Sequence, residues 1–259
     1  MTTPDADQVD EGSELVRLAS ADNFRDVAGD GYLTGAGVAL RTGVLFRSNE
    51  LQLSDADAHR IASLGVVDVF DLRGADEIEA HPDIDVPGAT WHHVEVAGIP
   101  MLRVAELASR EEAEQVMRAV YRAFVEAPGA RAAYGELLRR IADADGAQLF
   151  HCTAGKDRTG WASVLLLRLA GVPEQTVRED YLETNAHAGT REKYVAMIRE
   201  HLGEEKVPVY EAVMLADLDY VAAADAAVVE MFGDLDTYVR EGLGVDDATR
   251  ARVVARLLP

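Results

Sequence analysis

The sequence is short of cysteine, of lysine and of positive charge as a whole. Of its 259 residues only Cys152 is a cysteine, which excludes an internal disulfide and a zinc site built from several cysteines. Lysine and arginine number 25 against 46 aspartates and glutamates, and the resulting net charge of -21 excludes nucleic acid and anionic membranes as extended partners. Any site that binds an anion in such a chain must therefore create its own local positive field.

Targeting and membrane-spanning segments are also missing from the sequence. No N-terminal stretch has the basic and then apolar form of a signal peptide, and no apolar run approaches the length that spans a bilayer. We therefore expect a cytoplasmic protein, although export without a cleaved signal would leave no trace in the sequence. No convincing cluster of metal ligands stands out, and His92 and His93 point to opposite faces of a strand, so we expect neither a metal nor a cofactor.

What the sequence does have is one segment, 151–160, that reads His-Cys-Thr-Ala-Gly-Lys-Asp-Arg-Thr-Gly. A cysteine followed by an arginine six positions later has the spacing needed to wrap a loop around a phosphate group. The apolar run 147–150 before it predicts a buried strand, and the apolar residues of 160–170 after it predict a buried helix. A strand, an anion-binding loop and a helix N-terminus in this order predict a phosphate site.

The rest of the chain predicts an α/β fold with a central, mostly parallel sheet of about four strands flanked by helices. Segments that look like strands lie near 44–46, 66–70, 91–96 and 147–150, and helical patterns cover 55–64, 103–126, 130–143 and 160–170, while 23–27 and 29–37 look like loop and turn. Ligands of parallel sheets bind at the carboxyl ends of the strands. The sequences Phe46-Arg47-Ser48, Asp71-Leu72-Arg73 and His151-Cys152 stand at three such ends.

The two ends of the chain differ from this central part. Residues 1–18 are acidic and poor in large apolar groups, which predicts a loose tail, and 19–259 is expected to form a single domain. After Pro173 the pattern is helical to the end, with apolar stripes at Tyr194, Met197, Ile198 and Leu202 and at Tyr210, Val213, Met214 and Leu218. The stripes either pack on the core or form a helical hairpin over the site.

The loop segment resembles the signature of the cysteine-dependent tyrosine phosphatases, and is most similar to the bacterial tyrosine and lipid phosphatase family of mycobacterial protein tyrosine phosphatase B. The resemblance is carried by 23–27 (Asn-Phe-Arg-Asp-Val), 45–48 (Leu-Phe-Arg-Ser), 71–73 (Asp-Leu-Arg) and 151–160. It implies a four-stranded parallel sheet between helices, a helical lid within 188–220, and a phosphorylated protein or a phosphoinositide as substrate. Thr153 replaces a lysine of the phosphoinositide phosphatases, which makes a lipid substrate less certain.

In a cysteine-dependent phosphatase mechanism Cys152 is the nucleophile. The helix N-terminus and the cationic neighbours of Cys152 favour its thiolate form. Arg158 presents two N–H groups to two phosphoryl oxygens. The phosphate is expected to be held by the inward-turned backbone amides of Thr153, Ala154, Gly155, Lys156, Asp157 and Arg158. Supporting roles are expected for His151, which orients the loop, for Thr159, which bonds the sulfur or caps the helix, for Asp71 and Arg73, which brace the loop, and for Arg47, which braces it or touches substrate.

The leaving group needs a proton, and one carboxylic acid can act first as acid and then as base. Most tyrosine phosphatases carry this aspartate on a loop after the third strand, but here the stretch 96–101 contains no acid. Asp157 is therefore the candidate, as the resemblance also implies, with Glu95 as its rival and a structural pair with Lys156 or Arg47 as the alternative role. Lys156 itself could contact a second anionic group of the substrate or offset local acidity.

Other functions fit the same loop less well. A persulfide-carrying sulfurtransferase would use the cysteine, and a silent phosphate-binding module would not need Cys152, Asp157 and Arg158 together. Arsenate reduction lacks a second cysteine to resolve its intermediate. A phosphoinositide-preferring phosphatase remains the main alternative to a tyrosine or dual-specificity phosphatase.

Overall fold

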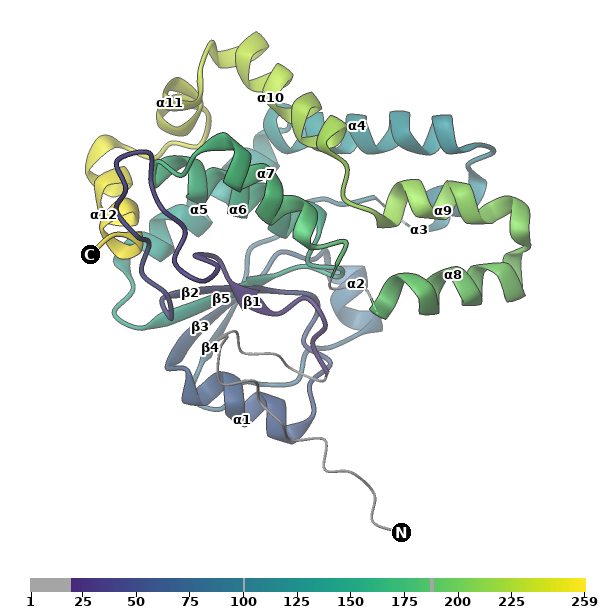
Figure 1. Ribbon diagram of the computed structural model, residues 1–259, viewed down its shortest axis with the longest axis horizontal. Helices are drawn as coiled ribbons and strands as arrows, with labels where there is room; N and C mark the ends of the chain where they lie inside the picture. The colour runs from purple at the N-terminus through teal and green to yellow at the C-terminus, as the bar shows by residue number, and fades with distance from the viewer. Residues whose placement is uncertain (1–19, 100, 187–188) are drawn as a thin grey trace.

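The computed structural model of the chain describes residues 20–99, 101–186 and 189–259, so the predicted tail over 1–18 lies outside the described residues. The fold is α/β, with a central sheet between layers of helices (Figure 1). The sheet has five strands in the order β1-β2-β5-β3-β4, with bounds Arg25–Asp26 for β1, Leu45–Ser48 for β2, Ala147–His151 for β5, Val66–Asp71 for β3 and Thr90–His93 for β4. Strands β2, β5, β3 and β4 are parallel, which confirms the predicted parallel sheet.

The fifth strand corrects the prediction that 23–27 is loop and turn. β1 pairs antiparallel with β2, and Arg25 lies opposite Arg47. A strand of two residues is too short to show an alternating pattern in the sequence, which is why it was missed. Strand β4 ends at His93, earlier than predicted, but the amides of Val94 and Val96 still bond to β3 and to Leu72 beyond its end.

Each sheet face buries its own apolar cluster, because successive strand residues point to opposite sides. On β5, Leu149 belongs to the cluster covered by α1 (Asp55–Ser63), and Phe150 belongs to the larger cluster that contains α6 (Asp157–Leu169). In Figure 1, α1 lies below the sheet, and α5, α6, α7 and α12 lie above it. Ser54 caps α1 as its sequence predicts, its side chain accepting from the Asp57 amide.

The remaining helices confirm a helical C-terminal portion and correct two of the predicted helices. Their bounds are Ala75–Ala80 (α2), Met101–Glu106 (α3), Arg110–Glu126 (α4), Pro128–Asp143 (α5), Glu174–Glu183 (α7), Gly189–Leu202 (α8), Glu204–Lys206 (η1), Val207–Met214 (α9), Leu218–Phe232 (α10), Leu235–Thr237 (α11), Tyr238–Gly242 (η2) and Asp247–Leu257 (α12). The single helix predicted over 103–126 is two, because Ser109 interrupts it and caps α4 by accepting from the Glu112 amide. Helix α6 begins at Asp157, three residues earlier than predicted.

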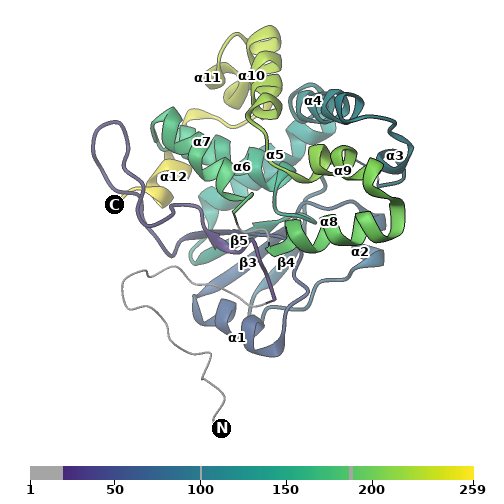
Figure 2. The same ribbon diagram turned by 45° about the vertical axis from the view of Figure 1, so that its right-hand side comes forward.

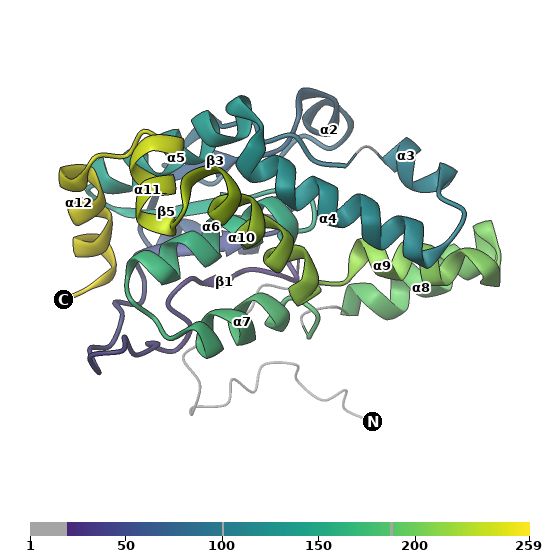
Figure 3. The same ribbon diagram turned by 90° about the horizontal axis from the view of Figure 1, so that it is seen from above.

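Helices α8 and α9 form a hairpin at the edge of the molecule, at the same end as α2 and α3 (Figures 2 and 3). Helix α9 packs against α4 as well as against α8. Of the two predicted stripes, Ile198, Tyr210 and Val213 are buried in the larger apolar cluster, while the side chains of Tyr194 and Met197 lie outside the described residues. A lid function for this hairpin stays a prediction. Among the helices of the described residues, none is long and apolar enough to cross a membrane.

Candidate active site

The register of the sheet brings the predicted site residues to one edge. Ser48 on β2 and Asp71 on β3 both lie opposite His151, the last residue of β5, so the three strands end level with one another. Cys152 is the next residue, 2% exposed, and the helix α6 begins five residues later. The sulfur therefore lies at the carboxyl edge of the sheet, in front of a helix N-terminus, as the sequence predicts.

The loop between them turns its carbonyl groups outward. The Asn23 side-chain amide donates to the carbonyls of Ala154 and Gly155, at 3.0 and 3.1 Å. Arg47 donates from Nη2 to the Gly155 carbonyl at 2.9 Å. Because these carbonyls are satisfied from outside, the amides of the loop are left to bind an anion from inside.

Gly155 makes this turn possible. Its φ is +65°, a conformation that other residues rarely adopt. A Cβ there would lie 2.5 Å from the Ser48 carbonyl oxygen and 2.8 Å from Asn23 Nδ2. The loop therefore packs too closely on β2 to admit any side chain at this position.

Arg158, from the first turn of α6, reaches back over the loop and meets Glu77 of α2. Its Nη1 and Nη2 donate to the two carboxylate oxygens of Glu77 at 2.6 and 2.7 Å, and Nη2 also donates to Thr153 Oγ1 at 3.3 Å. Among the described hydrogen bonds, those of the Arg158 side chain all run through its two terminal nitrogens. The guanidinium is thus held at its end, and its Nε side is left for a ligand.

Glu77 is a site residue that the sequence gives no reason to expect. Partial burial opposes its ionisation, but the hydrogen bonds and charge of Arg158 outweigh that effect and lower the pKa of Glu77 to about 2. Burial of Arg158 opposes its positive charge, but the hydrogen bonds and negative charge of Glu77 outweigh the effect of burial and raise the pKa of Arg158. Near neutral pH both groups are charged and form a close ion pair at the mouth of the loop.

Asp157 lies at the N-terminus of α6 and is paired with its neighbour. Lys156 Nζ donates to Asp157 Oδ1 at 2.6 Å, and the hydroxyl of Tyr121, on α4, donates to the same oxygen at 3.0 Å. The predicted alternative partner, Arg47, is instead 3.0 Å from Asp180. Lys156 is 2% exposed, and its ammonium also lies 3.4 Å from the Leu215 carbonyl oxygen.

Two buried guanidiniums share one carboxylate behind the loop. Arg47 Nη1 is 3.0 Å and Arg25 Nε 3.7 Å from the Asp180 carboxylate, and all three residues are nearly inaccessible. Burial and the charge of Arg25 together lower the pKa of Arg47 to about 10. Arg47 therefore braces the loop through the Gly155 carbonyl, and it does not reach the cavity described below.

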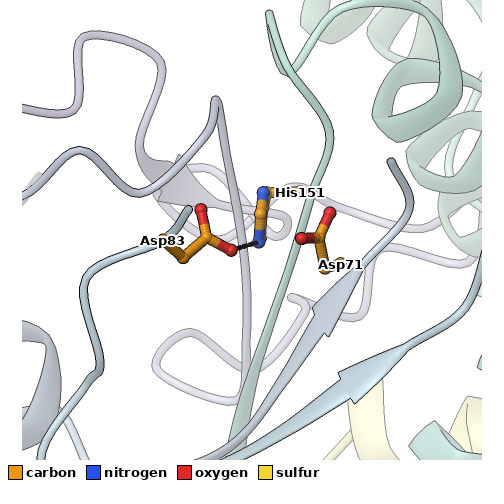
Figure 4. A group of neighbouring side chains, drawn as sticks. All are labelled: Asp71, Asp83 and His151. Atoms are coloured by element: carbon orange, nitrogen blue, oxygen red, sulfur yellow. Dashed lines mark ion pairs between the residues drawn. The ribbon is translucent and has the colours of Figure 1, made fainter. Parts of the chain in front are cut away.

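A second buried network supports His151, the residue before Cys152. Arg73 binds Asp71 at 2.8 Å and Asp83 at 2.8 Å, and Asp83 Oδ2 lies 3.1 Å from His151 Nε2. Figure 4 shows the His151 ring between the Asp83 and Asp71 carboxylates. These three groups could ligate a cation, but the Arg73 guanidinium already lies against both carboxylates and supplies the positive charge.

Two other predicted residues have different surroundings. Thr159 is the third residue of α6, so it does not cap that helix, and its buried hydroxyl makes no hydrogen bond to any described residue. Glu95, the rival acid, is exposed and does not line the cavity beside Cys152.

A cavity of about 580 Å³ opens above the loop. Cys152, Asp157 and Arg158 lie in its wall together with Thr153, Ala154 and Lys156. The apolar part of its wall comes from Ile99, Val120, Ile198, Leu202, Tyr210, Val213, Met214 and Leu215. The α8–α9 hairpin and the segment after it thus form one side of the space in front of the sulfur.

The sequence therefore identifies the residues of the loop but not the residues that hold the loop in place. Asn23 stands in one of the motifs already singled out, although nothing there indicated a bond to the loop. Glu77, Asp83, Asp180 and Tyr121 come from distant elements and carry no local pattern. Only the fold reveals that they converge on the loop.

Comparison with known proteins gives one consistent result. A profile described as "Tyrosine phosphatase family" matches residues 16–259. The chain is 30% identical over 278 residues to the triple specificity protein phosphatase PtpB of Mycobacterium tuberculosis, which covers 93% of this chain and 98% of that protein. It is 32% identical over 254 residues to a Cupriavidus necator protein provisionally named a tyrosine-protein phosphatase, covering 92% and 87%. A tyrosine-protein phosphatase of Nostoc commune is 35% identical over 132 residues, half of this chain and 44% of that protein.

Proposed function

The chain belongs to the tyrosine phosphatase family, and from this we propose that it hydrolyses phosphate monoesters through a covalent cysteinyl-phosphate intermediate, without a metal ion. One observation carries the proposal. Cys152 lies at the base of a cavity whose wall also holds Arg158 and Asp157, at the N-terminus of a helix and beside outward-bonded carbonyls. That arrangement supplies a nucleophile, a bidentate phosphate ligand and a proton carrier within one space.

In the first step the Cys152 thiolate attacks phosphorus, an S–P bond forms and the P–O bond to the leaving group breaks. The leaving oxygen takes a proton from the Asp157 carboxyl group, while the loop amides and Arg158 hold the phosphoryl oxygens. In the second step water attacks phosphorus, Asp157 accepts its proton, the S–P bond breaks and orthophosphate leaves. Asp157 thus returns to its starting protonation state, and no other reactant is needed.

The charges around the cavity favour a substrate with a single phosphate. Its wall holds the acidic side chains of Asp22, Glu50, Glu77 and Asp157 and the basic side chains of Lys156 and Arg158. Lys156 is already paired with Asp157, so it is poorly placed to bind a second phosphate. A polyphosphorylated inositol would bring further negative charge against this excess of carboxylates.

The apolar wall favours an aromatic group next to the phosphate. Ile99, Val120 and Val213 line the same cavity as the loop residues and would bury apolar surface of a bound side chain. A phosphotyrosine ring offers such surface, and a phosphoserine offers almost none. We therefore place phosphotyrosine ahead of phosphoserine and phosphothreonine, with phosphoinositides as the alternative substrate class.

The test is a substrate panel assayed with chelator present. Phosphotyrosine, phosphoserine and phosphothreonine peptides are compared with inositol lipids that carry one or two phosphates, using wild type and Cys152→Ser. We expect phosphotyrosine to give the highest kcat/KM, Cys152→Ser to lose activity on every substrate, and acid quenching of wild type to trap one phosphate on Cys152.

Three results would overturn this proposal. They are activity that survives Cys152→Ser, activity that the chelator abolishes, and thiosulfate sulfurtransfer without phosphate release. A preference for a doubly phosphorylated lipid would leave the cysteine chemistry intact but reverse the assignment of the substrate.

A further inference from the structure

The carboxylate of Asp157 is held through one of its two oxygens. Lys156 and Tyr121 both donate to Oδ1, at 2.6 and 3.0 Å, and Oδ2 makes no hydrogen bond to any described residue. A carboxyl group that exchanges a proton with substrate needs one oxygen free and the other fixed. The contacts of Asp157 divide its two oxygens in that way.

Tyr121 fixes Oδ1 from inside the protein. It lies on α4 with no exposed surface, and its hydroxyl is 2.7 Å from that of Tyr181, which lies on α7 and is 1% exposed. The two rings meet edge to face with centroids 6.3 Å apart. Two buried rings on separate helices therefore hold the hydroxyl that touches Asp157, and neither ring can move without disturbing the core.

The direction of these bonds follows from the chemistry of the groups. A carboxylate only accepts, so Tyr121 gives its single proton to Asp157 and must accept the proton of Tyr181. Burial raises the pKa of both phenols well above their usual value of 10, and the nearby charge of Asp157 raises them further. Both hydroxyls therefore stay protonated and act as donors across the working pH range.

We infer that Tyr121, supported by Tyr181, is a positioning residue for the proton transfer at Asp157. It fixes Oδ1 and the plane of the carboxyl group, so that Oδ2 gives the proton to the leaving oxygen and takes it back from water. Neither tyrosine gains or loses a proton in this cycle. This inference rests on the proposed function, because it assumes that Asp157 acts as the acid and base.

The test is Tyr121→Phe assayed on a series of aryl and alkyl phosphates with increasingly basic leaving groups. We expect turnover of poor leaving groups to fall about tenfold, because a misplaced acid loses its geometric advantage. Activated aryl phosphates, which need little protonation, should change less than about twofold, and KM should stay near the wild-type value. In an Asp157→Asn background Tyr121→Phe should add nothing.

Tyr220→Phe is the matched control. Tyr220 is also buried, its ring lies 5.8 Å from that of Tyr121, and its hydroxyl donates to the Ala212 carbonyl instead of to Asp157. It should lose a comparable amount of stability without changing the dependence on the leaving group. If Tyr121→Phe does not fold, Tyr181→Phe takes its place: it leaves the Tyr121 hydroxyl present but unsupported, and a smaller loss of the same pattern is expected.

The outcomes separate this inference from the proposed function. A loss that is equal for all leaving groups, or that persists in full on Asp157→Asn, would show that Tyr121 is merely structural and would overturn the inference. Neither result bears on the cysteine chemistry, which is judged on the same substrates by the loss of activity in Cys152→Ser.

Discussion

Gly155 shows how much of the candidate site depends on single residues of the loop. Its positive φ and its closeness to the Ser48 carbonyl have no counterpart elsewhere in the segment 152–158, where no other residue has a positive φ. The outward bonds of the Ala154 and Gly155 carbonyls to Asn23 exist only because the chain turns at this point. The shape of the anion site is therefore set by one missing side chain.

Gly155→Ala should destroy the site, with a destabilisation of about 1–3 kcal/mol from the backbone strain alone and more from the overlap with Ser48. Activity on every phosphate ester should fall by at least about 100-fold, since the loop amides no longer converge. Thermal unfolding and steady-state kinetics measure the two effects. Gly37→Ala is the control, because Gly37 also has a positive φ, of 79°, but nothing lies within 4 Å of its missing Cβ. Equal losses in both variants would contradict the argument from close packing.

At this scale the sequence was informative where a role depends on neighbouring positions. Cys152 and Arg158 belong to one contiguous pattern whose spacing implies a loop geometry, and the structure brings both into the same cavity. The partners of that loop could not be predicted. A carboxylate such as Glu77 or Asp180 looks like any other acidic residue of this chain until the tertiary fold places a guanidinium beside it.

At the scale of elements, the segment 215–217 connects the α8–α9 hairpin to the rest of the fold. The Asn185 side chain both donates to the Ala216 carbonyl, at 2.8 Å, and accepts from its amide, at 2.7 Å. The preceding carbonyl, of Leu215, faces Lys156, the partner of Asp157. One asparagine thus ties the end of the hairpin to the end of α7, next to the proposed acid.

Asn185→Ala should loosen the hairpin without unfolding the sheet. Two hydrogen bonds are lost, each worth about 1 kcal/mol, so the amides of α9 should exchange with deuterium up to about 30-fold faster while those of β5 keep their wild-type rates. Hydrogen–deuterium exchange followed by mass spectrometry resolves the two regions. Asn185→Asp keeps the acceptor for the Ala216 amide and should give an intermediate rate. Uniformly faster exchange in β5 as well would refute a local tether.

The sequence predicts helices and strands correctly where an apolar pattern is long. It fails where a capping residue divides a pattern that otherwise continues. The strands near 44–46, 66–70 and 147–150 are present, and β2 and β5 are buried throughout, while β3 is buried at Val66 and over 69–71. The helix predicted over 103–126 divides because Ser109 satisfies the first amides of α4, a local hydrogen bond that outweighs the continuing helical pattern. The sequence predicts the hairpin only as an alternative to packing on the core. Its apolar stripes do both, because they contribute residues to the core and to the cavity wall.

At the scale of the whole molecule, the net charge of -21 and the half-buried carboxyl group of Asp26 make stability depend on pH. Asp26, at the end of β1, accepts from the amides of Ala28 and Gly43, but burial outweighs these bonds and raises its pKa from 3.8 to about 6. The folded state therefore binds a proton there more tightly than the unfolded chain does. This contribution to stability is complete below about pH 3.8 and is lost as the pH rises through about 6.

The free energy of unfolding of wild type should accordingly rise as the pH is lowered from 7 to about 4, and Asp26→Asn should remove part of that rise. Relief of charge repulsion also favours the fold in this range, but it acts on both proteins, so the difference between them isolates Asp26. Urea denaturation at half-unit pH intervals gives the two curves. Parallel curves across the range would show that Asp26 titrates as it does in the unfolded chain.

The pairing of two buried guanidiniums with a single carboxylate behind the loop should couple the binding of an anion in the loop to folding. Arg25 and Arg47 repel each other and, among the described residues, share the single carboxylate of Asp180, so their surplus positive charge favours negative charge at the neighbouring Cys152 loop, whether on the thiolate or on a bound anion. A dianion seated in the loop would relieve that surplus, and the relief would belong to the folded state alone. Orthophosphate, the product of the proposed reaction, would thereby also act as a stabiliser of the scaffold that releases it.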